Sequence, residues 1–147
     1  MKKLLVLLLL LPSVSLANNQ IQYLETFIPS MIEYIENNSN LEYNGKQYPT
    51  LLIQDAEQIC KDVYDPPRGP DCTVAGYYNN DDNIIVIVDK PTEFMTEDRF
   101  QEVILLHELV HFLQYANGTD KTVECRQNLE IDAFRLQQEF VEDQQLG

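Results

Sequence analysis

The chain of 147 residues is expected to adopt an α+β fold, in which a small antiparallel or mixed sheet packs against helices. Apolar residues recur with helical spacing near the beginning of the chain, and strand-like runs follow in its middle part. Two further helical patterns occupy the remainder. This order, with helices grouped rather than alternating with strands, is typical of α+β domains.

Residues 1–17 have the features of an export signal. Lys2 and Lys3 precede an unbroken apolar run, Leu4–Leu11, which is too short to span a bilayer. Ser15-Leu16-Ala17 forms a small-x-small cleavage site. We therefore expect a signal peptide of bacterial type and a protein that is exported to the periplasm or secreted.

The mature chain, residues 18–147, is expected to form one domain, because a chain of this length builds one core. No cysteine follows the apolar run of the leader, so no stable membrane anchor is expected after cleavage. Without Lys2 and Lys3, 8 basic residues stand against 24 acidic ones, a net charge of −16. Because phosphate backbones bind clusters of Lys and Arg, this charge argues against nucleic acid as a partner. The negative net charge is typical of an exported protein that must stay soluble. The alternative is that the charge attracts a basic partner or substrate.

The first helix is expected over Ile21–Glu36, where apolar residues recur with a period close to 3.6. Pro29 lies inside this segment and is expected to kink the helix. Asn44-Gly45 is a hairpin signal, which predicts a turn between Leu41–Tyr43 and a strand in Tyr48–Gln54.

A short helix is expected to run from Asp55, a favoured N-cap residue, to Val63. Residues 65–71 are rich in Pro, Gly and Asp and are expected to form a loop. Strands are then expected at Val74–Tyr78 and Ile84–Val88, joined by a polar turn.

The central helix is expected to open at Thr96 and to end near Asn117-Gly118. From Val103 to Leu113 it is apolar nearly all round, as a helix buried in the core would be. A last helix is expected over Lys121–Asp143.

Three cysteines, Cys60, Cys72 and Cys125, remain after the leader, and export permits a disulfide. A bridge between Cys60 and Cys72 would close the proline-rich loop and contribute about 2–3 kcal/mol to stability. Pairing of either with Cys125 is the alternative. No C-x-x-C spacing occurs, so a cysteine-rich zinc site is not expected.

Both histidines of the chain lie in one pentapeptide, His107-Glu108-Leu109-Val110-His111. Residues four apart share one face of a helix, so the two imidazoles can bind a single ion there. Catalytic zinc takes ligands of this kind and keeps one position open for water. Glu108 is then expected to act as general base on that water.

A catalytic zinc site usually has a third protein ligand, which we expect among the acids that follow His111. Glu130 is the favoured candidate, because it lies well inside the last helix and the small Ala133 follows one turn later. Glu124 and Asp120 are the alternatives. Asp132 points elsewhere on that helix but is expected to hydrogen-bond a ligating histidine.

The motif His107–His111, followed by Glu130-Ile131-Asp132-Ala133, resembles the gluzincins, a branch of the zincin metallopeptidases. The resemblance covers residues 84–140 and implies a zincin-like fold with Zn²⁺ held by His107, His111 and Glu130. It also implies Glu108 as general base, and Ile84–Val88 as the sheet edge above the cleft, where an extended peptide pairs. The small size and the export signal are similar to those of minimal zincin-like bacterial proteins.

These features together predict an exported zinc-dependent hydrolase, a metallopeptidase acting on peptides or proteins. One alternative is a non-catalytic zinc-binding module, an adaptor or inhibitor; another is a structural domain with a chance motif. Peptidases of this type usually need one more donor for the oxyanion. Because no third histidine exists, the candidates are Tyr77, Tyr78 and Tyr115.

Overall fold

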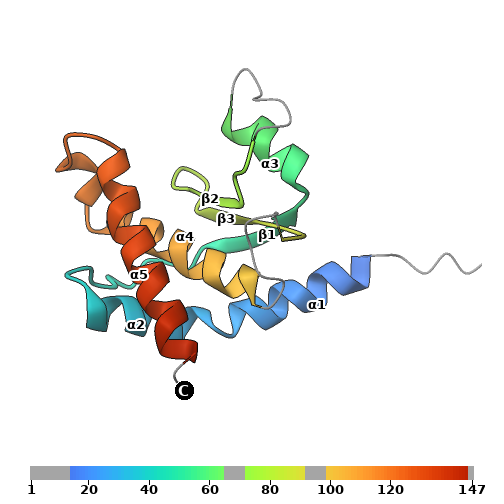
Figure 1. Ribbon diagram of the computed structural model, residues 1–147, viewed down its shortest axis with the longest axis horizontal. Helices are drawn as coiled ribbons and strands as arrows, with labels where there is room; N and C mark the ends of the chain where they lie inside the picture. The colour runs from blue at the N-terminus through green and yellow to red at the C-terminus, as the bar shows by residue number, and fades with distance from the viewer. Residues whose placement is uncertain (1–13, 65–71, 92–98, 146–147) are drawn as a thin grey trace, which may run out of the picture.

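The computed structural model describes residues 14–64, 72–91 and 99–145. The α+β expectation is confirmed, because helices pack on a three-stranded sheet (Figure 1). The loop predicted at 65–71, the helix start predicted at Thr96 and most of the predicted signal peptide lie outside the described residues. In chain order the elements are α1 (Val14–Glu25), α2 (Ile28–Asn38), β1 (Thr50–Gln54), α3 (Ala56–Val63), β2 (Gly76–Asn79), β3 (Ile84–Val88), α4 (Phe100–Ala116), the 3-10 turn η1 (Thr119–Lys121) and α5 (Gln127–Gln145).

The sheet is mixed and has the strand order β1-β3-β2. β3 pairs in parallel with β1, where Thr50 lies opposite Ile84, and antiparallel with β2, where Gly76 lies opposite Ile87. Its residues Ile85–Val88 are all buried, which explains the unbroken apolar run. The expectation that Ile84–Val88 forms the edge of the sheet is wrong, because this strand is central, with β1 and β2 at the two edges.

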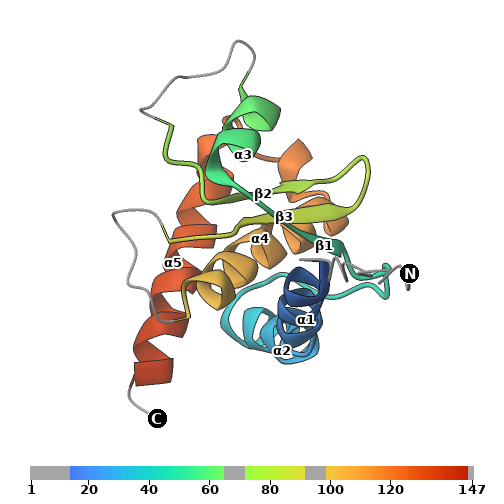
Figure 2. The same ribbon diagram turned by 90° about the vertical axis from the view of Figure 1, so that its right-hand side faces the viewer.

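The helices cover the sheet unequally. Figures 1 and 2 show α4 across one face of the sheet, with α1 and α2 beyond it, and α3 on the side of the sheet away from α4. The buried residues of α2, β3, α4 and α5 form one core. α4 lies between these layers, so apolar side chains are buried around most of its circumference, as its sequence predicts.

The N-terminal part differs from the expected single helix. Pro29 lies in the first turn of a second helix, α2, rather than kinking one helix, because that turn needs no N–H donor there. α1 begins at Val14, before the cleavage site predicted near Asn18. The hairpin predicted at Asn44-Gly45 does not form, since residues 41–44 are not in a strand and β1 pairs with β3.

The ends of several other elements follow local chemistry. Asp55 caps α3, and its carboxylate accepts the backbone N–H of Gln58 at 2.9 Å, as predicted. α4 begins after Arg99, which has a left-handed φ of 61°, and its end lies next to Gly118, with a φ of 70°. The last helix starts at Gln127 rather than Lys121, because a 3-10 turn occupies residues 119–121.

Of the cysteine pairings left open by the sequence, the structure has Cys60–Cys72, with the two Cα atoms 6.1 Å apart. The bridge ties α3 to the segment that leads into β2. Cys125 is an exposed free thiol. Within the described residues, no helix is long and apolar enough to cross a membrane.

Candidate metal centre

α4 and α5 run antiparallel, and His107 and His111 lie against the face of α5 that carries Glu130 and Gln137. His107 contacts Gln137, and His111 contacts Glu130, seven residues earlier on α5. This pairing follows from the helical period, because residues three, four and seven apart lie on one face. The fully buried Ala133 lies between those two contacts along α5, which allows the helices to approach closely.

Three candidate ligand atoms converge between the helices. The Nε2 atoms of His107 and His111 are 3.2 Å apart, and they lie 3.1 and 3.2 Å from the two carboxylate oxygens of Glu130. Tetrahedral zinc with ligand distances of about 2.0 Å requires ligand atoms about 3.3 Å apart. The observed spacings agree with this requirement, so His107, His111 and Glu130 could hold a metal ion.

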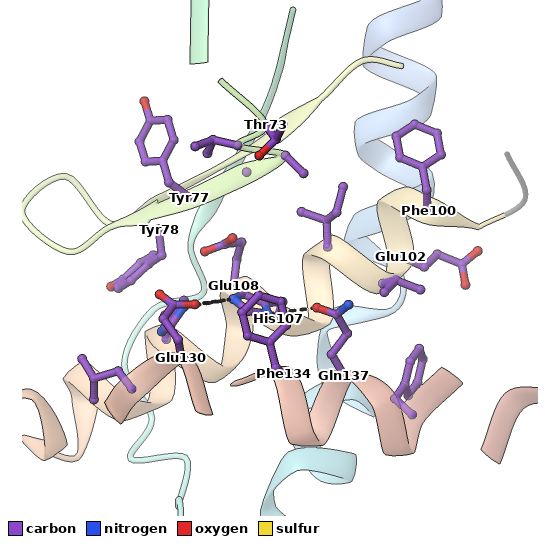
Figure 3. Close-up of a pocket in the computed structure, with 18 of the residues that line it drawn as sticks. Thr73, Tyr77, Tyr78, Phe100, Glu102, His107, Glu108, Glu130, Phe134 and Gln137 are labelled. Carbon is purple, nitrogen blue, oxygen red and sulfur yellow. Dashed lines mark hydrogen bonds and ion pairs between the residues drawn. The ribbon is translucent and has the colours of Figure 1, made fainter. Parts of the chain in front are cut away.

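The other nitrogen of each histidine contacts a glutamine. Nδ1 of His111 lies 2.8 Å from Oε1 of Gln114, and Nδ1 of His107 lies 2.9 Å from Oε1 of Gln137 (Figure 3). The Gln114 amide donates to the Leu129 carbonyl at 2.9 Å, which turns its oxygen towards His111. Since an amide oxygen only accepts, both contacts require a proton on Nδ1 of the histidine. Where an imidazole is neutral, its Nε2 lone pair then faces Glu130 and can bind a cation, and where it is protonated, Nε2–H donates to Glu130 instead.

The other acids considered as site residues lie elsewhere. Asp132 is exposed, and its carboxylate is 3.7 Å from the guanidinium of Arg135. Gln114 and Gln137 occupy the position expected for Asp132, because they project from the facing surfaces of α4 and α5 whereas Asp132 does not. Glu124 is exposed, and Asp120 lies in the 3-10 turn; neither belongs to the His107, His111 and Glu130 group.

Glu108 lies beside this group with only 5% of its surface exposed. Figure 3 shows it between α4 and the strand that carries Tyr77 and Tyr78. Burial raises the pKa of its carboxyl, and the neighbouring His107 and His111 and a hydrogen bond with the Tyr78 backbone partly offset that rise. The carboxylate is thus close to both the candidate ligands and the edge strand.

Gly76 permits this close packing of β2 on α4. A Cβ atom at this position would lie 2.7 Å from the Val86 carbonyl oxygen and 2.7 Å from Cγ2 of Ile104. It would also lie 3.5 Å from Oε1 of Glu108. No side chain fits there, so the glycine sets the distance between the edge strand and the general-base candidate.

The charges of the ligand group are coupled. Hydrogen bonds with His107 and His111 hold the pKa of Glu130 well below its usual range. Burial lowers the pKa of His111, but its hydrogen bond with Glu130 and the charges of Glu108 and Glu130 outweigh this effect and raise it above 6.5. In the metal-free protein a proton on His111 therefore balances part of the negative charge that a metal would balance.

The group opens into a cleft of about 1240 Å³ between β2 and α5, with α4 at its base. Of the three tyrosines proposed as donors, Tyr77 donates to Asp62 and Tyr78 to Asn83. The Tyr115 hydroxyl accepts a hydrogen bond from Arg126 at 3.0 Å, and both residues line the cleft.

Three residues of the site, Gln114, Gln137 and Gly76, were not predicted from the sequence. Gln114 follows His111 by three residues, and Gln137 follows Glu130 by seven, so helical spacing places each on the correct face. The glycine inside the strand-like run Val74–Tyr78 was a signal of close backbone approach.

The fold and the site define an α+β domain whose buried helix carries the H-E-x-x-H motif and whose next helix adds a glutamate. The chain belongs to the family described as Domain of unknown function (DUF6647), whose model matches residues 20–147. No curated protein and no solved structure matches the chain.

Proposed function

We propose that the protein is a zinc-dependent hydrolase, and more narrowly a metallopeptidase that cleaves peptide bonds. The position of Glu108 carries this proposal, because its buried carboxylate lines the same cleft as the three candidate ligands. Metal binding alone does not require a carboxylate there, whereas hydrolysis requires a base beside the reactive water. Three protein ligands also leave a fourth position for water, as in catalytic zinc sites.

The ligand set supports a zincin-like assignment. Two histidines one helical turn apart and a glutamate from the next helix agree with the resemblance to gluzincins. The Cys60–Cys72 disulfide agrees with an exported protein that folds in an oxidising compartment. These features support the proposal of an exported, minimal zincin-like hydrolase.

A bound zinc ion would supply an acidified water and polarise the scissile carbonyl. Glu108 would accept a proton from that water and donate it to the leaving amine. The hydrogen bond with the Tyr78 backbone and the lack of space at Gly76 hold its carboxylate in place. β2 is the edge strand on the side of the cleft, so an extended peptide that pairs along it would lie in the cleft over the ligands.

The test is the substitution Glu108→Gln in zinc-loaded protein. Cleavage of a mixture of peptides of defined sequence, followed by mass spectrometry, should slow by about 10²–10⁴-fold, the usual contribution of general base catalysis. Zinc content should stay the same, because Glu108 is not a ligand.

Glu124→Gln is the matched control, since it removes the same charge from an exposed position. Equal rates in the wild type and in Glu108→Gln would contradict the mechanism. Stable zinc binding without cleavage of any peptide by the wild type would favour the alternative, a zinc-binding module that acts as an adaptor or inhibitor.

A further inference from the structure

The two ends of the cleft differ in chemistry. α4 and α5 are antiparallel, so Arg99 lies near Gln144 at one end, and Tyr115 lies near Arg126 at the other. Tyr115 follows His111 by one helical turn, about 6 Å along the axis of α4. The candidate metal ligands thus lie between the two ends, within reach of a substrate that occupies both.

Among the described residues that line the cleft, the charged side chains at the end near Arg99 pair with each other. The Arg99 guanidinium binds the Glu102 carboxylate, with Nε and Oε2 2.8 Å apart. The Phe134 side chain is 58% exposed and packs its ring on His107, with centroids 4.7 Å apart. Other apolar side chains complete this part of the lining: Phe100, Val103, Ile104, Phe140 and Val141.

Within the described residues, the end near Arg126 has N–H and O–H groups that are left without acceptors. Of the three arginines in the described part of the chain, Arg99 and Arg135 pair with carboxylates, whereas Arg126 bonds only the neutral hydroxyl of Tyr115. Among the described residues nothing accepts the Tyr115 O–H itself. A guanidinium has five N–H donors, so most of those of Arg126 are free. In a chain with 24 acidic residues and 10 basic ones, an exposed cation that lines a cleft without a carboxylate partner is unexpected from charge pairing alone.

We infer that Arg126, oriented by its hydrogen bond to Tyr115, binds a carboxylate of the substrate at this end of the cleft. The inference rests on the proposed peptidase function and narrows its substrate class. A guanidinium binds a carboxylate through parallel N–H bonds, and the Tyr115 hydroxyl adds a third donor. In a peptide the carboxylate is either the C-terminus or an acidic side chain. The apolar end would then receive a bulky apolar side chain from the other side of the scissile bond.

Binding of three zinc-directed hydroxamates to the zinc-loaded protein tests the inference. All three carry the same leucine side chain; one ends in a carboxylate, one in a carboxamide, and one in a carboxamide with an added glutamate side chain. Calorimetry should show that the wild type prefers at least one of the two acidic ligands over the neutral one by about tenfold, the order of one charge-assisted hydrogen bond. Which acidic ligand is preferred distinguishes a C-terminal carboxylate from an acidic side chain.

Arg126→Gln should abolish this preference and leave the affinity for the neutral ligand unchanged. Tyr115→Phe should weaken the preference, because Arg126 loses its partner. Arg135→Gln is the matched control: it removes the same charge from α5 at a residue paired with Glu139, outside the cleft, and should keep the preference.

Equal affinity of the wild type for all three ligands would overturn the role of Arg126 and leave the zinc site intact. Loss of the preference in Arg135→Gln as well would show a general charge effect and would also overturn it. Failure of every hydroxamate to bind zinc-loaded wild type would overturn the proposed function and this inference with it.

Discussion

The side chains of His111 and Gln114 are joined by a contact of 2.8 Å between Nδ1 and Oε1, one helical turn apart on α4. Gln114 has only 1% of its surface exposed, and its amide group also donates to the Leu129 carbonyl at the beginning of α5. One buried glutamine thus sets the tautomer of a candidate ligand and connects the two helices that form the site.

Replacement of Gln114 should therefore weaken metal binding although Gln114 is not a ligand. Gln114→Ala is expected to lower zinc affinity by about 10–100-fold, the usual effect of losing a partner of a ligating histidine. It should also destabilise the fold by about 1–3 kcal/mol, because the Leu129 carbonyl loses its donor. Competition with a zinc indicator and urea denaturation measure the two effects.

Two further variants separate these roles. Gln114→Glu keeps an acceptor for His111 and should retain most of the zinc affinity. Gln138→Ala removes a glutamine from the exposed surface of α5, where it bonds Glu142, and should change neither quantity. Unchanged affinity in Gln114→Ala would show that Gln114 does not orient the histidine.

Glu130 is expected to be the third ligand. Glu130→Gln should reduce zinc affinity by more than about 100-fold, because an amide oxygen is neutral and binds zinc poorly. This loss is larger than the about 10–100-fold expected when a ligating histidine loses its hydrogen-bond partner. Glu124→Gln removes the same charge six residues earlier and should have no effect. Zinc content after dialysis, measured by atomic emission, distinguishes the two. Loss of zinc from Glu124→Gln instead would assign the ligand to the alternative acid.

Zinc affinity should fall at acidic pH. The pKa of His111 is raised above 6.5 in the metal-free protein, and zinc requires the neutral imidazole. Protons therefore compete with zinc as pH falls through that raised pKa, and the logarithm of the affinity should decrease by about one per pH unit below it. Glu130, whose pKa is lowered, stays ionised over this range and adds no proton of its own. A titration between about pH 8 and pH 5 would show the change, and a flat profile would contradict it.

The raised pKa of His111 affects the stability of the metal-free protein in the opposite direction, because this stability should increase as pH falls. A raised pKa in the folded state means that the protonated His111–Glu130 pair stabilises the fold at low pH, and this contribution is lost as pH rises through the His111 pKa. Removal of zinc by a chelator should therefore destabilise the protein more at neutral than at mildly acidic pH. Thermal unfolding with and without chelator measures the difference.

Gly76→Ala is expected to disturb both the fold and the site. The added methyl group would lie 2.7 Å from the Val86 carbonyl oxygen of β3, which cannot move without shifting the sheet, and 2.7 Å from Cγ2 of Ile104. We expect a loss of about 1–3 kcal/mol in the free energy of unfolding and slower hydrolysis through displacement of Glu108. Gly45→Ala is the control, since Gly45 has a φ of 81° but open space around it. Its backbone strain should cost about 1–2 kcal/mol without changing the rate of hydrolysis per folded molecule.

Reduction of the Cys60–Cys72 bridge should destabilise the fold by about 2–3 kcal/mol, as expected for a closed loop of this length. Urea denaturation of Cys60→Ser/Cys72→Ser against the wild type measures this effect. Cys125→Ser should leave stability unchanged, because Cys125 is exposed and unbridged. Zinc affinity should persist in both variants, since the candidate ligands lie on α4 and α5.

The sequence alone was sufficient wherever a single element carries the signal. The H-E-x-x-H pentapeptide places two imidazoles on one helix face through the helical period, and the apolar surroundings of that motif predicted the buried helix α4. The run Ile84–Val88 predicted a strand, although not its central place in the sheet, and Asp55 predicted the beginning of α3. These features depend on neighbours a few residues away, which the sequence displays directly.

Tertiary structure decided the features that join distant segments. The antiparallel packing of α4 on α5 selected Glu130 to face the histidines and placed Gln114 and Gln137, rather than Asp132, on the imidazole nitrogens. Pairing of β2 with β3 placed Gly76 against Glu108 and made β2 the edge of the cleft. Such contacts depend on how whole faces fit together in a close-packed interior, and many acids and amides on a helix satisfy the local pattern equally well.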